Sequence, residues 1–298
     1  MLFNAFVLAL REIRRNVLRS SLTALGIIIG VASVIIMVTL GNGATEQVRS
    51  DIASMGSNLL TVRPGQRVGP GGASSASKPF RRQDIDALTR EVDSVTSIAP
   101  VATINLSVIS GAKNRSTNVT GTTNAYFESG GWKLTSGRWF SESELRSGAA
   151  VCIIGQTTRS ELLGSADPIG SRLRLRSLSC SVIGLLESKG KSQFGQDRDD
   201  TVVIPLRTMQ RRLSGNEDVD QVQLSVSNSV STEKAQQDVT RLLRERRRLA
   251  READDDFNIM DQQEIANTLG GATRTLTALL AAVAAISLLV GGIGIMNI

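Results

Sequence analysis

Two long stretches without a charged residue, one near each end of the chain, limit most strongly what this sequence can fold into. The first covers residues 20–45 and is almost entirely apolar from 22 to 40, and the second covers residues 275–298. A helix of about 20 residues is about 30 Å long, which matches the hydrocarbon thickness of a bilayer. The pattern therefore predicts a membrane protein with two transmembrane α-helices, at 21–41 and 275–298.

The charges beside the first stretch predict the orientation of the chain. The segment before it is rich in arginine, whereas the segment after it carries charges of both signs. The arginines before it are Arg11, Arg14, Arg15 and Arg19. Cytoplasmic flanks of transmembrane helices are enriched in Lys and Arg. We therefore expect both ends of the chain in the cytoplasm and residues 42–274 in an extracytoplasmic domain.

Residues 1–20 have the pattern of an amphipathic helix. Large apolar side chains recur on one helical face, at Phe3, Phe6, Leu10, Ile13 and Val17. Helices of this kind lie at the membrane surface with the apolar face toward the lipid. We expect a cytoplasmic interfacial helix at 1–20. A cleaved signal peptide is the alternative, although its apolar region would be unusually long.

The composition argues against several classes of function. The chain has no histidine, which removes Ser-His-Asp triads, Cys-His dyads and most zinc sites. It has no GxxxxGK[ST] motif and therefore no P-loop of its own. Aromatic residues make up only 3% of a chain with a net charge of +6, which gives little support to nucleic-acid binding. We expect no catalytic residues, no metal site and no cofactor in this chain.

The extracytoplasmic segment repeats one order of elements, strand, helix, strand. A strand at 59–62, a helix at 82–92 and a strand at 95–101 form the first unit. A strand at 222–226, a helix from about Thr232 that includes Leu249, and a strand at 257–260 form the second. Two such βαβ units can share one sheet with both helices on one face, which predicts an α+β domain.

A β-rich module is expected between the two units, at 106–215. Five segments in it have the composition of strands, and they are separated by Gly- and Pro-containing turns. The expected strands are 117–122, 149–154, 172–175, 180–186 and 201–204.

Four motifs now suggest a family. They are GRWF at 137–140, DPIG at 167–170, VIG at 182–184 and GGIGIMNI at 291–298. With the first apolar stretch, LRSSLTALGIIIGVASVIIMVTLGNG, they make the chain resemble the permease part of MacB-type ABC transporters, within the FtsX-like superfamily, along essentially its whole length.

This resemblance implies a fold and a role. The fold is a porter-like subdomain, at 45–105 and 216–262, with an inserted sabre-like module at 106–215. The role is that of an efflux permease in a bacterial inner membrane, working as a homodimer with a partner ABC ATPase that binds the ATP. The partner's ATP hydrolysis would drive movement outside the membrane, called mechanotransmission. A periplasmic adaptor protein and an outer-membrane channel are further implied partners.

The resemblance also implies a difference from the family in the number of transmembrane helices. Permeases of this family have four transmembrane helices, and the chain stops in or just after the second. We therefore expect the chain to correspond to a part of such a permease, as a fragment, a truncated product or a split subunit.

Glycines in the apolar stretches are the candidate helix-packing residues. Gly26 and Gly30 form a small-xxx-small pair in the first stretch, and Gly291, Gly292 and Gly294 lie in the second. Small residues let transmembrane helices approach closely. The alternative is that the bilayer merely tolerates these glycines.

Other conspicuous residues allow two interpretations each. Cys152 and Cys180 lie in expected strands and form either one disulfide or two buried free thiols. Trp132 and Trp139 are interpreted as packing anchors rather than a ligand cage. A basic run beside three aspartates is interpreted as a solvated helix end with local ion pairs rather than an anion or lipid site. The basic residues are Arg244, Arg246, Arg247, Arg248 and Arg251.

The main alternative function is a transmembrane receptor or sensor. An extracytoplasmic α+β domain between two spans also suits a protein that binds a ligand outside the cell and signals inside. Such a protein would bind a small ligand through residues 45–272 alone. An enzymatic extracytoplasmic domain is a weaker third hypothesis, since no nucleophile has an evident base nearby.

Overall fold

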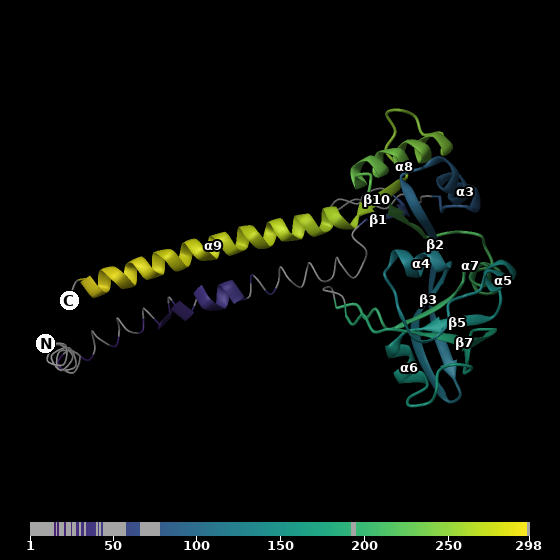
Figure 1. The fold of residues 1–298 in the computed structure, drawn as a ribbon, viewed down its shortest axis with the longest axis horizontal. Coiled ribbons are helices and arrows are strands. Elements are labelled where there is room, and N and C mark those ends of the chain that lie inside the picture. The colour runs from purple at the N-terminus through teal and green to yellow at the C-terminus, as the bar shows by residue number, and fades with distance from the viewer. Residues whose placement is uncertain are drawn as a thin grey trace. The chain divides into compact units, whose positions relative to one another are not determined.

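A computed structural model describes most of the chain. The chain divides into two compact units (Figure 1). One unit is Met1–Ser50 with Ala266–Ile298, and the other is Asp51–Ile265. The structure describes residues 58–65, 78–191 and 195–296, and also 15, 17, 21, 25, 28–29, 31–32, 34–39, 41 and 43.

The first part of the unit Asp51–Ile265 is a four-stranded antiparallel sheet with two helices. Its strands are β1 (Leu59–Pro64), β2 (Val95–Ser110), β9 (Gln221–Val226) and β10 (Phe257–Asp261). They are ordered β10-β1-β9-β2. Each βαβ unit therefore encloses a strand of the other, because β9 lies between β1 and β2, and β1 lies between β9 and β10. The two predicted strand–helix–strand units are confirmed and interleave in one sheet.

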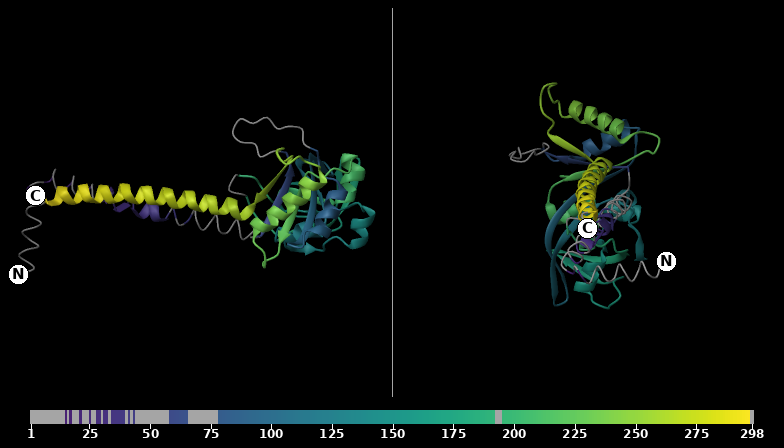
Figure 2. Two further views of the ribbon diagram at one scale, coloured as in Figure 1. Left: turned by 90° about the horizontal axis from the view of Figure 1, so that it is seen from above. Right: turned by 90° about the vertical axis from the view of Figure 1, so that its left-hand side faces the viewer.

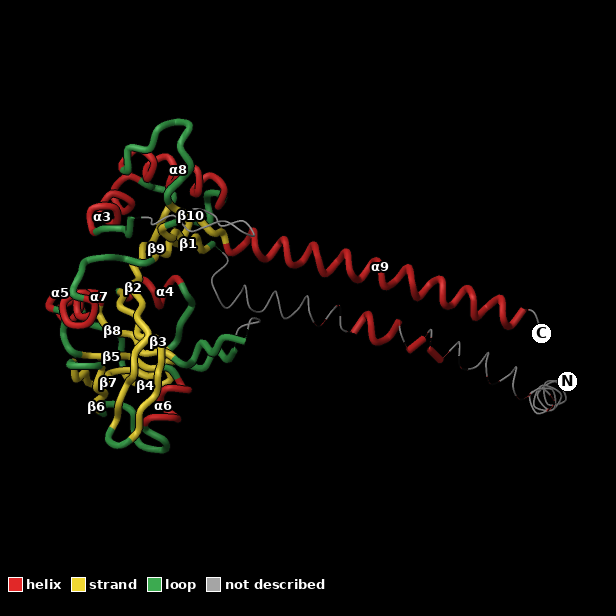
Figure 3. The backbone as a smooth tube through the Cα atoms, turned by 180° about the vertical axis from the view of Figure 1, so that it is seen from behind, coloured by secondary structure: helices red, strands yellow, loops and turns green. Residues whose placement is uncertain are grey.

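Alternation along the strands gives this sheet one apolar face and one polar face. The helices α3 (Arg82–Glu91) and α8 (Thr232–Arg246) both cover the apolar face, as predicted (Figures 1 and 3). Successive side chains on a strand point to opposite faces. The residues under the helices include Leu60, Val62, Val222, Leu224 and Val226. Their neighbours Thr61, Arg63, Gln221 and Gln223 therefore face away from the helices.

The helix α8 ends earlier than the sequence predicts. The Ser231 hydroxyl accepts a hydrogen bond from the Lys234 amide at 3.3 Å and caps its start. The helix stops at Arg246, and Arg248 has a φ of 52°, in the left-handed region. The prediction that Leu249 belongs to this helix is wrong. Leu249 still packs against the sheet-and-helix core from the following loop.

The second part of this unit is built around a closed ring of strands. Its remaining strands are β3 (Lys113–Thr122), β4 (Leu134–Gly137), β5 (Val151–Ile154), β6 (Arg172–Leu175), β7 (Leu178–Leu186) and β8 (Thr201–Pro205). Pairing runs from β2 through β3, β8, β5, β7 and β6 back to β2. Closing the ring leaves these strands no free edge over the paired residues. All five predicted strands of the β-rich module are present.

The ring encloses its own hydrophobic core. The residues inside are fully or almost fully buried, and they include Val108, Val119, Cys152, Ile154, Leu173, Leu175, Cys180, Val182 and Val202. A separate aromatic cluster around Phe127 and Phe140 packs on the outside of β5 and β8 through Ile153 and Val203. The inserted module therefore has a core distinct from that of the βαβ sheet.

The long strand β2 belongs to both sheets. Residues from Val95 to Val101 pair with β9, and residues from Ala102 to Ser110 pair with β3 (Figure 3). The sequence predicts only 95–101 as a strand, so this prediction is too short. The strand continues because its second half alternates between buried and exposed residues inside the ring, with Leu106 and Val108 buried.

The sequence does not predict the strand β4, and it does not predict the short helices. They are α4 (Asn124–Ser129), α5 (Glu142–Ser147), α6 (Gln156–Leu162), α7 (Leu206–Thr208) and the π-helical turn η1 (Met209–Ser214). Each has seven residues or fewer, too short to show a helical period. One start signal exists, because Ser141 and Glu144 form a capping box at α5.

The unit Met1–Ser50 with Ala266–Ile298 contains most of the long helix α9 (Gln262–Met296), which is continuous along its length (Figure 2). No helix within the described part of the chain combines the length and the apolarity needed to cross a bilayer. The spans at 21–41 and 275–298 therefore stay predictions. The surface helix at 1–20 falls almost entirely outside the described residues.

Candidate functional site

A polar cleft opens on the face of the βαβ sheet opposite α3 and α8. Its volume is about 350 Å³. It is lined by β1, β2, β3 and β9, by the segment Tyr126–Trp132, and by the loop between β7 and β8. The lining side chains include Thr61, Arg63, Thr103, Asn118, Thr120, Gln221 and Gln223 from the strands, and Tyr126, Trp132, Lys189, Gln196, Asp197, Arg198 and Asp200 from the other segments. Both parts of the unit Asp51–Ile265 thus contribute to one cleft.

The floor of the cleft is made of neutral hydrogen-bonding groups. Arg63 Nε donates to Gln221 Oε1 at 2.9 Å, and Asn105 Nδ2 donates to Asn118 Oδ1 at 3.1 Å. The Ser129 hydroxyl, from α4, donates to Gln223 Oε1 at 3.5 Å. These contacts use one oxygen of each floor amide. None of these hydrogen bonds therefore uses the side-chain amide nitrogen of Gln221 or Gln223.

The wall of the cleft holds a lysine against an aromatic pair. Lys189 Nζ lies 4.4 Å from the centroid of the Trp132 ring and also donates to the Gly130 carbonyl. The Tyr126 ring stacks near Trp132, with 6.5 Å between centroids. Burial, and then the nearby Arg198, lower the pKa of Lys189 to about 8. Burial raises the pKa of Tyr126, while Arg198 acts in the opposite direction.

One buried aspartate fixes the backbone around Lys189. The Asp199 carboxylate accepts hydrogen bonds from the Lys189 amide at 2.8 Å and from the Gly190 amide at 3.1 Å, and also from the Ser188 hydroxyl. Asp199 is only 5% exposed. A carboxylate with three donors is strongly held, since hydrogen bonds to a charged group are stronger than neutral ones. The backbone at Lys189 and Gly190 is therefore held in a defined conformation beside the cleft.

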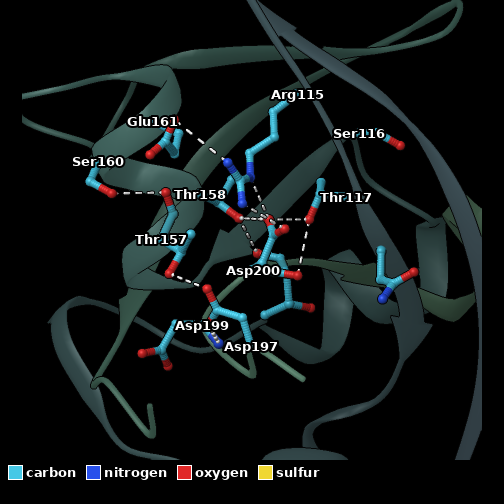
Figure 4. A network of polar contacts seen from close by, with 12 residues as sticks. Arg115, Ser116, Thr117, Thr157, Thr158, Ser160, Glu161, Asp197, Asp199 and Asp200 are labelled. Atoms are coloured by element: carbon cyan, nitrogen blue, oxygen red, sulfur yellow. Dashed lines mark hydrogen bonds and ion pairs between the residues drawn. The ribbon is translucent and has the colours of Figure 1, made fainter. Parts of the chain in front are cut away.

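Asp200, the residue after Asp199, anchors the same segment to the closed ring of strands, which forms a small barrel (Figure 4). Arg115 from β3 donates twice to Asp200, with both nitrogen–oxygen distances at 3.0 Å. The Thr117 hydroxyl donates to Asp200 Oδ1 at 2.6 Å, and the Thr158 hydroxyl of α6 approaches the same oxygen at 3.5 Å. The pKa of Arg115 is raised, mainly by this hydrogen bonding to Asp200. The carboxylate is therefore fully engaged within the protein.

A third aspartate completes the anchor. Asp197 accepts a hydrogen bond from the Thr157 hydroxyl at 2.9 Å and another from the Asp199 amide at 2.9 Å (Figure 4). The sequence DRDD at 197–200 thus alternates between anchoring carboxylates and the cleft-lining Arg198. Sequence reasoning missed this motif. Its only signal is the density of aspartates directly before a strand, and the side-chain partners of Asp197 and Asp200 on α6 and β3 are 40 to 85 positions away in the chain.

Comparison with known proteins gives the family. A family model, the MacB-like periplasmic core domain, matches residues 20–242. The chain belongs to the MacB-like family. The expectation drawn from its motifs is therefore confirmed.

Relatives of the MacB-like chain include three proteins named macrolide export ATP-binding/permease protein MacB. The protein of Azoarcus sp. strain BH72 is 38% identical over 97% of this chain and 43% of its own length. That of Chlorobium luteolum is 38% identical over 97% and 44%. That of Rhodospirillum rubrum is 36% identical over 99% and 44%. The chain thus spans less than half the length of these relatives.

Two solved structures share the MacB-like fold. The periplasmic region of MacB from Actinobacillus actinomycetemcomitans aligns with a TM-score of 0.63 and 20% identity, over 74% of this chain and 97% of that one. The extracellular domain of the noncanonic ABC-type transporter YknZ from Gram-positive bacteria aligns with a TM-score of 0.55 and 17% identity, over 68% and 100%. At these identities the likeness establishes the fold alone.

The glycines predicted to pack helices stay a prediction. Gly26 and Gly30 lie outside the described residues. Gly291, Gly292 and Gly294 lie within α9, where nothing tests their packing. A different glycine makes a close contact. A Cβ on Gly41 would lie 2.8 Å from the Thr277 hydroxyl oxygen of α9.

Cys152 and Cys180 lie in β5 and β7 and are both buried free thiols in this structure. Burial first, and then the neighbouring Cys180, raise the pKa of Cys152 well above its usual value. The two thiols are therefore close enough to interact inside the barrel, and whether they pair in the cell stays a prediction.

The basic run at the end of α8 and just beyond it makes more contacts within the protein than a solvated helix end would make. Arg244 pairs with Asp255 and donates to the Ala250, Arg251 and Ala253 carbonyls. Arg247 donates to Asp256 at 2.8 Å and lies over the Phe80 ring at 4.6 Å. The local ion pairs are present as predicted, but they are partly buried and hold the chain to Phe80.

The two tryptophans differ. Trp139 packs with its ring centroid 4.5 Å from that of Phe127, as a packing anchor should. Trp132 packs against the same aromatic cluster but also lines the cleft.

Proposed function

We propose that this chain is a permease component of a MacB-like ABC transporter for export or efflux. The observation that carries the proposal is the family match over residues 20–242, together with relatives named as export permeases. A partner ABC ATPase binds and hydrolyses ATP in this proposal, and this chain holds no cofactor and catalyses no reaction. The permease works as a homodimer in a bacterial inner membrane. A periplasmic adaptor protein and an outer-membrane channel complete the assembly.

The proposed arrangement places residues 1–20 at the cytoplasmic surface, spans at 21–41 and 275–298, and residues 42–274 in the periplasm. Exposed apolar side chains support it. On α9, Leu276, Leu279, Val283, Ile286 and Leu289 are each at least 60% exposed. Such a surface on a soluble helix would be unfavourable in water, whereas lipid covers it at no such cost.

Within the periplasmic part, residues 45–105 and 216–262 are proposed as the porter-like subdomain and 106–215 as the sabre-like module. The separate cores of the βαβ sheet and the barrel support this division. Neither half of the proposed porter-like subdomain has a complete sheet without the other, since their strands interleave.

The route for mechanotransmission follows from the end of the sheet. β10 ends at Asp261 and α9 begins at the next residue, without a connecting loop. Asp261 is 5% exposed, and its carboxylate accepts a hydrogen bond from the Gln263 amide at 2.8 Å. β10 pairs with β1 over five residues. A displacement of α9 is thus passed directly to a paired strand, because an α-helix is stiff along its axis.

Cysteine labelling tests the topology on which this function depends. Ala112 is exposed at the turn between β2 and β3, so Ala112→Cys should react with a membrane-impermeant maleimide in intact cells. Asn4→Cys should react only after the membrane is permeabilised. The unmodified chain is the blank, since its own two cysteines are buried. Labelling of Asn4→Cys but not Ala112→Cys in intact cells would refute the arrangement.

A transmembrane sensor is the second candidate, and the polar cleft is the observation in its favour. A sensor would change conformation when a ligand binds outside the cell and would not respond to nucleotide. A transporter component responds to nucleotide hydrolysed by its partner. Measuring the response of the periplasmic domain to ATP therefore separates the two.

A further inference from the structure

The cleft on the sheet face opposite α3 and α8 brings positive charges together. Lys189 and Arg198 lie in one loop and are close enough that Arg198 acts electrostatically on Lys189 and on Tyr126. Arg63 lines the same cleft from β1. Like charges held near one another in a partly desolvated site repel, and a bound anion removes that repulsion.

The cleft is lined by three cations, Arg63, Lys189 and Arg198, and by two carboxylates, Asp197 and Asp200. Asp200 is engaged by the bidentate Arg115 and by Thr117. Asp197 is engaged by Thr157 and by the Asp199 amide. An ion pair with Arg115 cancels most of the charge of Asp200 for a group on the cleft side. Asp197 keeps its charge, so the lining still has more positive than negative charge.

The position of Lys189 is set by the protein rather than left to solvent. Its backbone amide is held by Asp199 at 2.8 Å, and its ammonium group lies 4.4 Å from the Trp132 ring centroid. Fixing a cation in advance reduces the entropy that a ligand must remove on binding. Two of the contacts of the ammonium, the Trp132 ring and the Gly130 carbonyl, are with uncharged groups.

Neutral donors and acceptors line the floor below these cations. Gln221 and Gln223 come from β9, Thr61 from β1, and Asn118 and Thr120 from β3. They sit on rigid paired strands, where their spacing is fixed by the sheet register. Groups of this kind recognise hydroxyl, amide and carbonyl groups of a ligand.

We propose that this cleft binds a small hydrophilic organic anion, with a carboxylate or similar acidic group at Lys189 and Arg198 and neutral polar groups along Gln221 and Gln223. The volume of about 350 Å³ is at the lower end for ligand sites, which favours a metabolite-sized molecule over a large drug. The inference goes beyond the proposed transport function, because it requires neither the membrane spans nor a partner ATPase.

Calorimetric titration of the full chain in detergent with glutarate tests the proposal. Glutaramide is the matched control ligand, with the same carbon skeleton and amides in place of both carboxylates. We expect glutarate to bind with a Kd of about 1 mM or tighter, and at least about tenfold tighter than glutaramide. Equal affinity for the two, or no heat from glutarate up to about 10 mM, would overturn the proposal.

Variants locate the binding. Lys189→Met and Arg198→Met should each weaken glutarate binding by about tenfold, whereas Lys189→Arg should retain it within about threefold. Arg90→Met is the matched control, since it removes one exposed positive charge from α3 on the opposite face of the sheet. If Arg90→Met weakens binding as much as Lys189→Met does, the attraction is only a property of net charge and the cleft is not the site.

A variant of the cleft floor tests the neutral part of the proposed site. Gln223→Leu removes a neutral floor group without touching the loop at Lys189, and it should weaken glutarate binding by about threefold to tenfold. Retained affinity in Gln223→Leu and in Arg198→Met, in chains with unchanged circular dichroism, would also overturn the assignment.

Discussion

Replacing Gly155 with alanine should shift the segment that shapes the cleft, because a backbone atom occupies the space that the new methyl group needs. Gly155 stands between β5 and α6, and a Cβ there would lie 2.2 Å from the Asp199 carbonyl oxygen. Ordinary carbon–oxygen contacts begin at about 3.3 Å, so one of the two backbones has to move by about 1 Å.

The cost has two parts. Overpacking of this kind costs about 1–3 kcal/mol. The Gly155 amide also donates to the Thr201 carbonyl at 3.0 Å, and stretching that bond removes up to about 1 kcal/mol. We therefore expect a loss of about 1–4 kcal/mol in the free energy of unfolding, measured by urea denaturation followed by circular dichroism.

The same shift should weaken ligand binding. Asp199 holds the Lys189 and Gly190 amides, so moving its backbone disturbs the position of the Lys189 side chain. Gly271→Ala is the matched control, because nothing lies within 4 Å of a Cβ at that helical position. The control should be neutral or stabilising by about 0.5–1 kcal/mol. If Gly155→Ala is as stable as Gly271→Ala, the close approach to Asp199 is refuted.

Three further predictions follow from contacts in the described residues. Arg138 hydrogen bonds to Glu144 and lowers its pKa to about 2, so this contact stabilises the fold above about pH 4.5 and its contribution is lost as the pH falls toward 2. A double-mutant cycle of Arg138→Gln and Glu144→Gln should give about 0.5–1 kcal/mol at pH 7 and nearly nothing at pH 2; equal coupling at both would contradict it. Arg247→Ala should lower the free energy of unfolding by about 1–3 kcal/mol, because it removes an ion pair with Asp256 and a contact with the Phe80 ring. The control Arg241→Ala, at a side chain that is 76% exposed, should cost less than about 0.5 kcal/mol. Similar losses in the two variants would refute the buried role of Arg247. Cys152 and Cys180 should both resist alkylation until the chain unfolds and then give two modified thiols by mass spectrometry, and two unreactive sulfurs after unfolding without reductant would mean a disulfide.

The sequence predicts local elements well where one face is buried continuously. The alternation of Val222, Leu224 and Val226 gives β9, and the spacing of Ile85 and Leu88 gives α3, because each pattern reflects one apolar face. The strand β6 is predicted with its observed bounds, since buried Leu173 and Leu175 alternate with exposed arginines.

The closure of the barrel and the double role of β2 could not be predicted from the sequence. Both depend on which strand meets which, as in the pairing of Val108 with Leu175, and no local pattern encodes that choice. The short helices were missed because seven residues or fewer hold less than two turns.

The cleft escaped prediction for a similar reason. Arg63, Lys189 and Arg198 are ordinary surface residues in the sequence, and only the interleaved sheet and the anchored loop bring them to one place. Polar residues on one face of a strand predict that this face is exposed to solvent. The local sequence does not show that another part of the chain partly covers that face. The spacing of Gly26 and Gly30 predicts one packing surface in the first apolar stretch, whereas the close contact among the described glycines of that stretch is at Gly41, next to Thr277 of α9.

Nucleotide-dependent movement of the periplasmic domain tests the central claim most directly. The chain is reconstituted with its ATPase partner in proteoliposomes, and the maleimide labelling rate of Ala112→Cys is compared with ATP, with a non-hydrolysable analogue and without nucleotide. Our account predicts that the rate changes by at least about twofold between the ATP-bound and nucleotide-free states, because the two states differ outside the membrane. An unchanged rate, in a preparation that hydrolyses ATP, would contradict the assignment of this chain to an ATP-driven permease.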